Sequence, residues 1–323
     1  MLDIIFSILL FIIGYLIIYF AADVFIDNLK EVCILYRISP FIIGAIILGI
    51  DPEESIASII AAINGLSYLA VGNVIGNSIF ALTISFAIPA FFYKIDFNSI
   101  SQFYFLLLYT CLSLILLGII VNSGILFIGI ITIILYFVYL IRNMKQSSKV
   151  SSIEFSSTEN LNKNITDTQE PKVELKSKKI ILIIISFISI FLGGELLIFA
   201  SERIIIQTKI PETFFGLVII AFITNVEELT LVIKSIKKKS VEIGLGGMIG
   251  KVIWNLTLSF GISAIFIINL QFLWILFWNW FLLVILIVYF NFISKKQNLV
   301  WKDGIVLILL LISFLTINFT IVN

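Results

Sequence analysis

Apolar stretches long enough to cross a lipid bilayer recur along almost the whole chain, and they constrain its fold more than any other feature. Hydrophobic residues make up 60% of the 323 residues, and the mean hydropathy is +1.16. A helix needs about 20 apolar residues to span the hydrocarbon core, and a row of such helices predicts an all-α polytopic membrane protein. We expect ten transmembrane helices, near residues 4–26, 38–63, 68–92, 101–120, 124–142, 179–204, 211–235, 242–268, 271–293 and 301–321.

The placement of Lys and Arg predicts the orientation, because cytoplasmic loops carry an excess of them. With the N-terminus outside, eighteen of the 21 basic residues fall in cytoplasmic loops, and only Arg203 and Lys209 fall outside. The remaining one, Lys251, falls within a predicted span. We therefore expect a multi-pass protein of the cell membrane with both termini outside.

One long polar stretch divides the chain. It is rich in Ser, Thr, Asn, Glu and Lys, the composition of a flexible linker. We expect a first five-helix repeat at 1–143, a cytoplasmic flexible linker at 144–178 and a second five-helix repeat at 179–323. Because each half has an odd number of spans, the second enters the membrane from the opposite face, and the repeats are predicted to be inverted.

The two halves share a gapless repeat at an offset of 174 residues. Gly72–Phe86 and Gly246–Phe260 are identical at eight of fifteen positions, including two glycines spaced for close helix packing. In each copy a glutamate, Glu54 or Glu228, precedes the second glycine by 22 residues. Transporters with inverted repeats place their sites near the bilayer midplane, where such repeats meet.

Acidic clusters interrupt two of the predicted spans, as Asp51-Pro52-Glu53-Glu54 and as Thr224-Asn225-Val226-Glu227-Glu228. An ionised carboxylate in hydrocarbon costs roughly 2.5 kcal/mol or more, so it usually faces a partner, water or an ion. Proline breaks the helix and frees carbonyls, which are tolerated at mid-membrane where they line a cavity. Such oxygens suit a hard cation such as Ca²⁺. The alternative is a proline kink with paired acids.

Only one acid of each pair is expected to face an ion, because adjacent helical residues point about 100° apart. We favour Glu54 and Glu228, which keep the shared spacing to the glycines. Glu53 and Glu227 are expected to be protonated or to line the cavity. On the glycine-bearing helices, the positions that look across at the acids are expected to be Asn77, Ala81, Lys251 and Asn255.

Lys251 is the sole basic residue within a predicted span. A buried ammonium needs a carboxylate partner or loses its proton. We expect Lys251 to reach Glu54, Glu228 or Asp51 and to supply a fixed positive charge where a cation would otherwise bind. The alternative is that its side chain snorkels to the membrane surface.

These motifs resemble the cation/calcium antiporter superfamily, which includes the sodium/calcium exchangers. In that family each repeat carries a Gly-Thr-Ser-Leu-Pro-Glu type segment and, further on, Gly-Asn-x-Ile-Gly-Ser-Asn-x-x-Asn/Asp. Gly72–Phe80 matches the second element closely and Gly246–Asn255 matches it more loosely. The resemblance implies that Glu54 and Glu228 are the central cation-binding glutamates. Together with Asp51, the expected cation ligands are Glu54, Glu228, Asn77, Thr224, Asn225 and Asn255, and the residues expected to modulate the site are Lys251, Glu53, Glu227 and Asn73.

The chain departs from the family pattern at the site itself. The segment Gly49–Glu54 lacks the Thr-Ser pair, the family serine is replaced by Asn77 and Lys251, and the later asparagine is replaced by Ala81. Fewer oxygen ligands and an added lysine favour a proton-coupled exchanger or one with fewer cation sites.

The sequence therefore predicts a secondary active antiporter that exchanges Ca²⁺ for Na⁺ or H⁺ by alternating access. One alternative is a transport-inactive or different-cation relative closed by Lys251. Another is an intramembrane aspartyl protease, although no Gly-x-Gly-Asp motif is present. The chain has no histidine, which excludes His-based triads. We expect no enzyme and no cofactor, and the expected partners are inorganic cations and the lipid bilayer, not nucleic acid.

Overall fold

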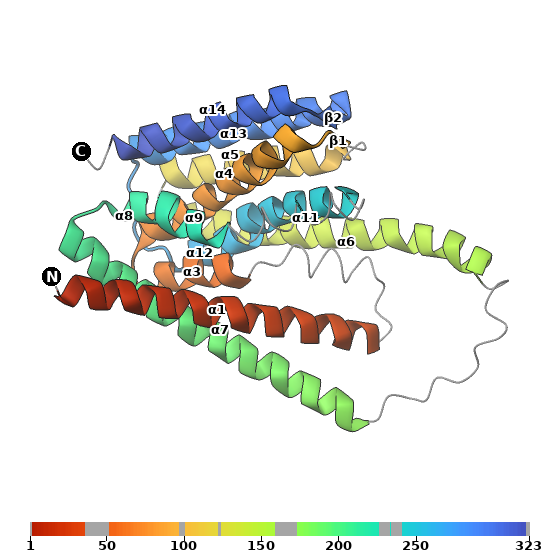
Figure 1. Cartoon of the computed structure of the whole chain (residues 1–323), viewed down its shortest axis with the longest axis horizontal. Coiled ribbons are helices and arrows are strands. Elements are labelled where there is room, and N and C mark those ends of the chain that lie inside the picture. The colour runs from red at the N-terminus through yellow and green to blue at the C-terminus, as the bar shows by residue number, and fades with distance from the viewer. Residues whose placement is uncertain are drawn as a thin grey trace.

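The computed structural model of the protein describes residues 2–35, 52–96, 101–121, 124–158, 173–225, 233 and 241–320, and it is almost entirely helical (Figure 1). In the first half the helices are α1 (Leu2–Leu35), α3 (Pro52–Ile63), α4 (Ser67–Phe92), α5 (Gln102–Ile120) and α6 (Ile125–Thr158). In the second half they are α7 (Val173–Thr208), α8 (Glu212–Phe214), π-helical η2 (Phe215–Ile220), α9 (Ala221–Thr224), α11 (Val241–Trp254), π-helical η3 (Asn255–Ser259), α12 (Phe260–Phe266), α13 (Trp274–Lys296) and α14 (Trp301–Phe319).

Eight segments in the described ranges are long and apolar enough to cross a membrane, and they match eight of the ten predicted spans. The two acid-bearing spans are represented by shorter apolar helices, Glu54–Ile63 and Glu212–Thr224, and their other parts lie outside the described residues. The start of α1 and the end of α14 lie at one end of the bundle, and the end of α6 and the start of α7 lie at the other (Figure 1). This placement agrees with an even number of spans.

Helical structure enters the stretch from 144 to 178 that the sequence predicts to be a linker. Helix α6 continues to Thr158, and α7 begins at Val173. At the same end of the bundle, two short antiparallel strands, β1 (Ile95–Asp96) and β2 (Asn298–Leu299), join the turn after α4 to the turn before α14. Side-chain periodicity carries no signal for a pairing of two residues.

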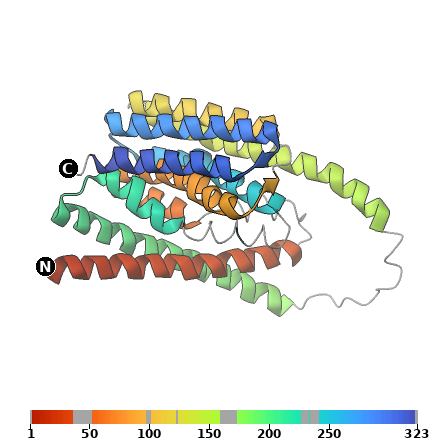
Figure 2. The same cartoon turned by 45° about the horizontal axis from the view of Figure 1, so that its top comes forward.

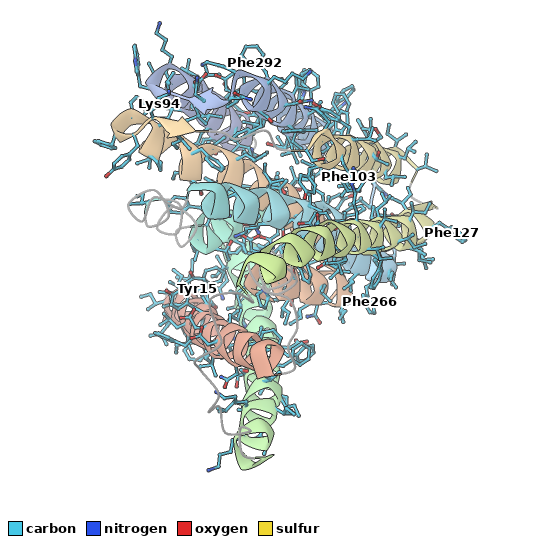
Figure 3. The ribbon with its side chains drawn as sticks, turned by 90° about the vertical axis from the view of Figure 1, so that its right-hand side faces the viewer. Tyr15, Lys94, Phe103, Phe127, Phe266 and Phe292 are labelled. Carbon is cyan, nitrogen blue, oxygen red and sulfur yellow. The ribbon has the colours of Figure 1, made fainter. Side chains whose placement is uncertain are left out.

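Helix α4 and the α11–α12 segment form the centre of the bundle. In the most apolar 18-residue stretch of α4 83% of the residues are buried, and in that of Gly247–Phe266 78% are buried, against 28% in the corresponding stretches of α1 and α7. The outer helices α1 and α7 run together along one side (Figures 1 and 2). Exposed aromatic side chains such as Phe127 and Phe292 point outward (Figure 3), as expected of helices that face lipid.

The two halves interlock, because the last helix of each packs on the third helix of the other. Helix α6 meets α12 where Gly129 and Gly261 face each other, and a Cβ added at Gly129 would lie 2.7 Å from the Gly261 carbonyl oxygen. Helix α14 meets α4 in the equivalent way, since a Cβ at Gly304 would lie 3.0 Å from the Ala87 carbonyl oxygen. Small residues allow this close backbone approach in membranes.

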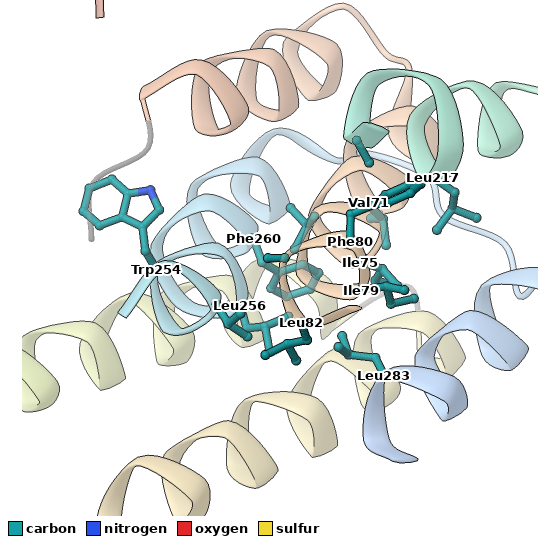
Figure 4. Packing of buried hydrophobic residues seen from close by; sticks show 14 of the residues in the cluster. Val71, Ile75, Ile79, Phe80, Leu82, Leu217, Trp254, Leu256, Phe260 and Leu283 are labelled. Carbon is teal, nitrogen blue, oxygen red and sulfur yellow. The ribbon is translucent and has the colours of Figure 1, made fainter. Parts of the chain in front are cut away.

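Buried aromatic and branched residues fill the space between the central helices (Figure 4). The ring of Phe80 on α4 packs edge-on against Phe222 and Phe314, with centroid distances of 5.7 and 5.4 Å. Phe86 packs in the same manner against Phe290 at 5.1 Å. Edge-to-face pairs add to the area that each ring buries, so these contacts fix α4 of the first half against the second half.

The glycines of the first repeat bring α4 directly onto η2. A Cβ at Gly76 would lie 2.2 Å from the Leu217 carbonyl oxygen, and one at Gly216 would lie 2.4 Å from the Leu69 carbonyl oxygen. The two backbones are therefore in close contact at both glycines. This contact places α9, which follows η2, beside the middle of α4, so that Thr224 and Asn225 reach Asn77.

Replacing Gly76 with Ala is expected to lower the stability of the fold by about 1–3 kcal/mol, because α4 and η2 must separate to admit the methyl group. The thermal midpoint of the purified protein in detergent is the measurement. Gly124→Ala is the matched control, since the nearest atom to an added Cβ there is Val121 Cγ1 at 4.0 Å. Equal midpoints for the two variants would contradict the predicted contact.

Candidate cation site

Glu54 lies near the start of α3 and is the centre of a buried polar cluster. Its side chain is 1% exposed. Side chains from the other half of the chain surround it: Asn255 Nδ2 donates to Glu54 Oε2 at 2.8 Å, and Asn225 Nδ2 donates to Oε1 at 3.1 Å. The carboxylate therefore lies between the two repeats.

Lys251 also lies beside the carboxylate. Its Nζ lies 3.0 Å from Glu54 Oε1, and its side chain is 5% exposed. The lysine thus points into the bundle and forms an ion pair, rather than snorkelling to the membrane surface. Because desolvating two charges is costly, a buried pair of this kind persists only where further hydrogen bonds satisfy the partners.

A line of amides and hydroxyls links Glu54 to α4. Asn73 Nδ2 donates to the Glu54 backbone carbonyl at 3.1 Å and to Ser58 Oγ at 2.8 Å. Asn77 Nδ2 donates to Asn73 Oδ1 at 3.0 Å. The amide oxygen of Asn77 in turn accepts from Thr224 Oγ1 at 2.9 Å and from Asn225 Nδ2 at 2.7 Å. Asn73 therefore orients α3 on α4, while Asn77 joins α4 to the end of α9.

Both π-helical segments adjoin this cluster. Segment η2 ends four residues before Thr224, and η3 begins with Asn255. The stretch of the first half that is equivalent to η3 lies in α4, which is α-helical from Ser67 to Phe92. The stretch equivalent to η2 lies outside the described residues. A π turn inserts a residue and re-aims the side chains around it, and such turns are frequent at functional sites. Of the two equivalent stretches that are both described, η3 departs from the α-helix and α4 does not, and Asn255 of η3 reaches Glu54.

Two amide oxygens of the cluster have no hydrogen-bond partner among the described residues: Asn225 Oδ1 and Asn255 Oδ1. Both belong to side chains that are 1% exposed. Buried acceptors are normally satisfied, so each such oxygen calls for an explanation. Oxygen atoms of amides and carboxylates are the ligands that hard cations prefer. The chemistry of the cluster is therefore suited to a cation that would take up these oxygens together with Glu54.

The predicted site residues divide into two groups. The structure brings together Glu54, Lys251 and the four other side chains Asn77, Thr224, Asn225 and Asn255, with Asn73 behind them. Asp51, Glu227, Glu228 and the side chain of Glu53 lie outside the described residues. Ala81 is fully buried and presents a methyl group where the second repeat has Asn255.

Sequence reasoning overlooked Ser55, Ser58 and Trp254. Ser58 accepts a hydrogen bond from Asn73, and Ser55 accepts one from the indole N–H of Trp254. Ser55 and Trp254 are each adjacent to a predicted site residue, and Ser58 lies one turn beyond Glu54. All three occur in stretches whose composition is that of an ordinary apolar span. A buried serine or tryptophan in such a run carries no signal until its partner on another helix is known.

Two interlocked helical repeats, with a carboxylate held between them by residues of both, define a secondary ion transporter. The sodium/calcium exchanger protein family model matches residues 6–145 and 178–320. The chain belongs to this family and is a cation antiporter, not an enzyme. This membership excludes the aspartyl protease alternative.

Individual proteins show the same likeness. An uncharacterized membrane protein of Methanocaldococcus jannaschii, MJ0091, is 25% identical over 261 residues, which cover 79% of this chain and 80% of that protein. The sodium-calcium exchanger NCX_Mj soaked with 10 mM Na⁺ and zero Ca²⁺ is similar in structure, with a TM-score of 0.58, 19% identity and coverage of 97% and 99%. The same exchanger soaked with zero Na⁺ and Ca²⁺ gives a TM-score of 0.56 at 20% identity. The ten-helix fold with two repeats is thereby confirmed.

Lys251→Met is expected to destabilise the cation-free protein by about 3 kcal/mol, because it removes the ammonium that faces a buried carboxylate. Combining it with Glu54→Gln is expected to recover part of the loss, since the double variant no longer buries that charge. Thermal unfolding of the four proteins in cation-free detergent solution measures the coupling. Strictly additive losses would show that the two side chains do not interact.

Proposed function

We propose that this protein exchanges Ca²⁺ for Na⁺ or H⁺ by alternating access, with Glu54 and Glu228 as the central ligands. The observation that carries the proposal is the Glu54 carboxylate, buried between the repeats and surrounded by amides, a hydroxyl and one ammonium. A carboxylate at this depth has a functional role by default. The name of the structurally similar protein, a sodium-calcium exchanger, favours these ions.

Cation binding would exchange protein donors for a metal ion around one carboxylate. Asn225 and Asn255 turn their Nδ2 groups toward Glu54, and their oxygens have no hydrogen-bond partner among the described residues. Rotating either amide by half a turn would bring the oxygen to the position of the nitrogen. A Ca²⁺ ion seated against Glu54 would then gain amide ligands without a movement of the helices.

Lys251 is proposed to occupy the place of one cation. An ammonium 3.0 Å from the carboxylate supplies one positive charge that stays with the protein. It repels a second cation at the same oxygen, and at this separation the repulsion is substantial even at a high effective dielectric constant. We therefore expect fewer cations to be carried per cycle than the number of acids would suggest.

The access change is proposed to be a sliding of α1 and α7 against the central helices. The two helices pack on each other through Gly14 and Gly193, where a Cβ at Gly14 would lie 3.0 Å from the Gly193 carbonyl oxygen. Tyr15 Oη of α1 donates to the Ile223 carbonyl at 3.3 Å, beside Thr224. Movement of α1 would therefore pull on the backbone next to Thr224. Both termini are proposed to lie outside and the central linker in the cytoplasm.

A second candidate is a relative whose site is closed by Lys251. The ion pair between Lys251 and Glu54 favours it, because the carboxylate already has a cation partner. In this case the protein would keep the fold of an antiporter, and no transported ion would displace the ammonium. The two candidates differ in whether the wild-type protein takes up Ca²⁺.

Glu54→Gln and Glu228→Gln are each expected to reduce Ca²⁺ uptake driven by a Na⁺ or H⁺ gradient at least about a hundredfold. Loss of one anionic ligand removes several kcal/mol of cation stabilisation in a low-dielectric site. Uptake of ⁴⁵Ca²⁺ into proteoliposomes is the measurement. Glu202→Gln, at an exposed position of α7, is the matched control and should transport as the wild type does. Unchanged uptake in both glutamine variants would refute the assignment.

Lys251→Ser restores the residue type that the family has at this position and separates the two candidates. If Lys251 occupies a cation position in a working exchanger, the variant should transport with at least one more monovalent cation or charge per Ca²⁺. If Lys251 closes the site, the wild type should be inactive and the variant should gain Ca²⁺ binding. Reversal potentials in proteoliposomes give the charge per cycle, and isothermal titration gives the binding. A variant identical to the wild type in both would contradict either role.

A further inference from the structure

Ser55 is the acceptor of two hydrogen bonds that cross from the second repeat to the first. The indole Nε1–H of Trp254 donates to Ser55 Oγ, and so does the hydroxyl of Ser259. A hydroxyl oxygen has two lone pairs, so both bonds can form at once. All three side chains are buried, with exposures of 5%, 9% and 1%. We call these three residues the Ser55 staple.

The staple lies beside the cation site in a particular way. Ser55 follows Glu54 in α3, and Trp254 precedes Asn255 at the junction of α11 and η3. The bond between Ser55 and Trp254 therefore runs beside the bond from Asn255 Nδ2 to Glu54 Oε2, one residue away on each chain segment. Ser259, one turn beyond Asn255 and the last residue of η3, closes on the same hydroxyl. Both ends of the π segment are thus tied to the residue next to Glu54.

A third helix fixes the indole from its other side. Tyr136 of α6 packs edge-on against Trp254, with ring centroids 5.1 Å apart and planes at 87°. Trp254 stands at the edge of the aromatic and aliphatic cluster, near the start of α3 (Figure 4). Its ring is therefore immobilised by packing while its N–H serves as the donor, a geometry in which the hydrogen bond needs little further ordering.

The internal repeat has no equivalent of the staple. At the offset of 174 residues, Ser55 corresponds to Leu229, Trp254 to Phe80 and Ser259 to Ser85. Leucine and phenylalanine offer no polar hydrogen, and Ser85 Oγ has no hydrogen-bond partner within the described ranges. The staple is therefore not a shared element of the helix packing. It distinguishes the Glu54 side of the site from the other side.

We infer that the Ser55 staple is a positioning element that holds Glu54 and Asn255 in register for the cation, an inference that rests on the proposed function. When a cation draws the carboxylate and the amide into its coordination shell, the bond between Glu54 and Asn255 is lost. The staple bonds next to it remain, so α3 and η3 keep their separation. Ligands held in place before the ion arrives bind it more tightly, because less order must be imposed on binding.

The test uses the full chain in proteoliposomes and separates the hydroxyl from the shape of residue 55. Ser55→Val and Ser55→Thr place side chains of the same shape at this position, and only threonine keeps the hydroxyl. Trp254→Phe removes the donor while retaining a ring, and it is the residue that the first repeat has at the equivalent position. Ser85→Ala is the matched control, because it removes a buried serine hydroxyl that forms no hydrogen bond to the described residues.

Ser55→Val and Trp254→Phe are each expected to raise the half-saturating Ca²⁺ concentration about tenfold with little change in maximal uptake, the effect of one buried hydrogen bond. The double variant should be no worse than Ser55→Val, whereas Ser55→Thr and Ser85→Ala should resemble the wild type. The indole ¹⁵N–¹H signal of Trp254 should shift in Ser55→Val but not in Ser55→Thr.

Glu54-dependent uptake with an unaltered half-saturating concentration in Ser55→Val and Trp254→Phe would overturn this inference alone. Equal impairment by valine and threonine would also overturn it, because it would assign the effect to packing. Absence of any Glu54-dependent uptake in the wild type would overturn the proposed function together with the inference. If Ser55→Val does not fold, the comparison of Trp254→Phe with Ser85→Ala still tests the inference, because only Trp254→Phe removes a hydrogen bond to Ser55.

Discussion

The ion pair between Glu54 and Lys251 is the interaction on which the rest of the site depends. Two opposite charges buried at the centre of a membrane bundle are retained only if their remaining hydrogen-bonding capacity is met. For the carboxylate, the donors include the amide of Asn225 directly after α9, the amide of Asn255 in η3 and the hydroxyl of Thr224 in α9. These polar residues of the second half bind one acid of the first half. The halves are therefore held together by hydrogen bonds and an ion pair as well as by apolar packing.

Close backbone contact makes this chemistry possible. Where Gly76 lies against Leu217, α4 and η2 approach without intervening side chains, and the short side chains of Asn77 and Thr224 can meet. The same principle recurs where each half places its last helix on the third helix of the other. A site built from both repeats thus requires small residues at the crossings. Larger residues there would separate the ligands before they would disturb the individual helices.

The described residues of the two halves are alike in backbone arrangement but differ in their polar side chains. Lysine, both π-helical segments and the donors of the Ser55 staple all belong to the second half, while Glu54 and its serine neighbour belong to the first. The asymmetry fits a site in which one fixed positive charge competes with transported cations on one side. The 19% identity to a solved exchanger shows a shared fold, and the number of cations carried per cycle stays a proposal.

Apolar segment length and the glycine motif repeated at a fixed offset were enough to predict the helical membrane fold, the repeat and the family, because each depends on local composition or on a fixed separation along the chain. The orientation that the basic residues predict stays a prediction. The role expected of Glu228 stays a prediction. Only the tertiary structure decided that Lys251 reaches Glu54, and that Trp254 reaches Ser55. These pairs are about 200 residues apart in sequence, and which side chains meet depends on helix rotation and on π turns that no local pattern encodes.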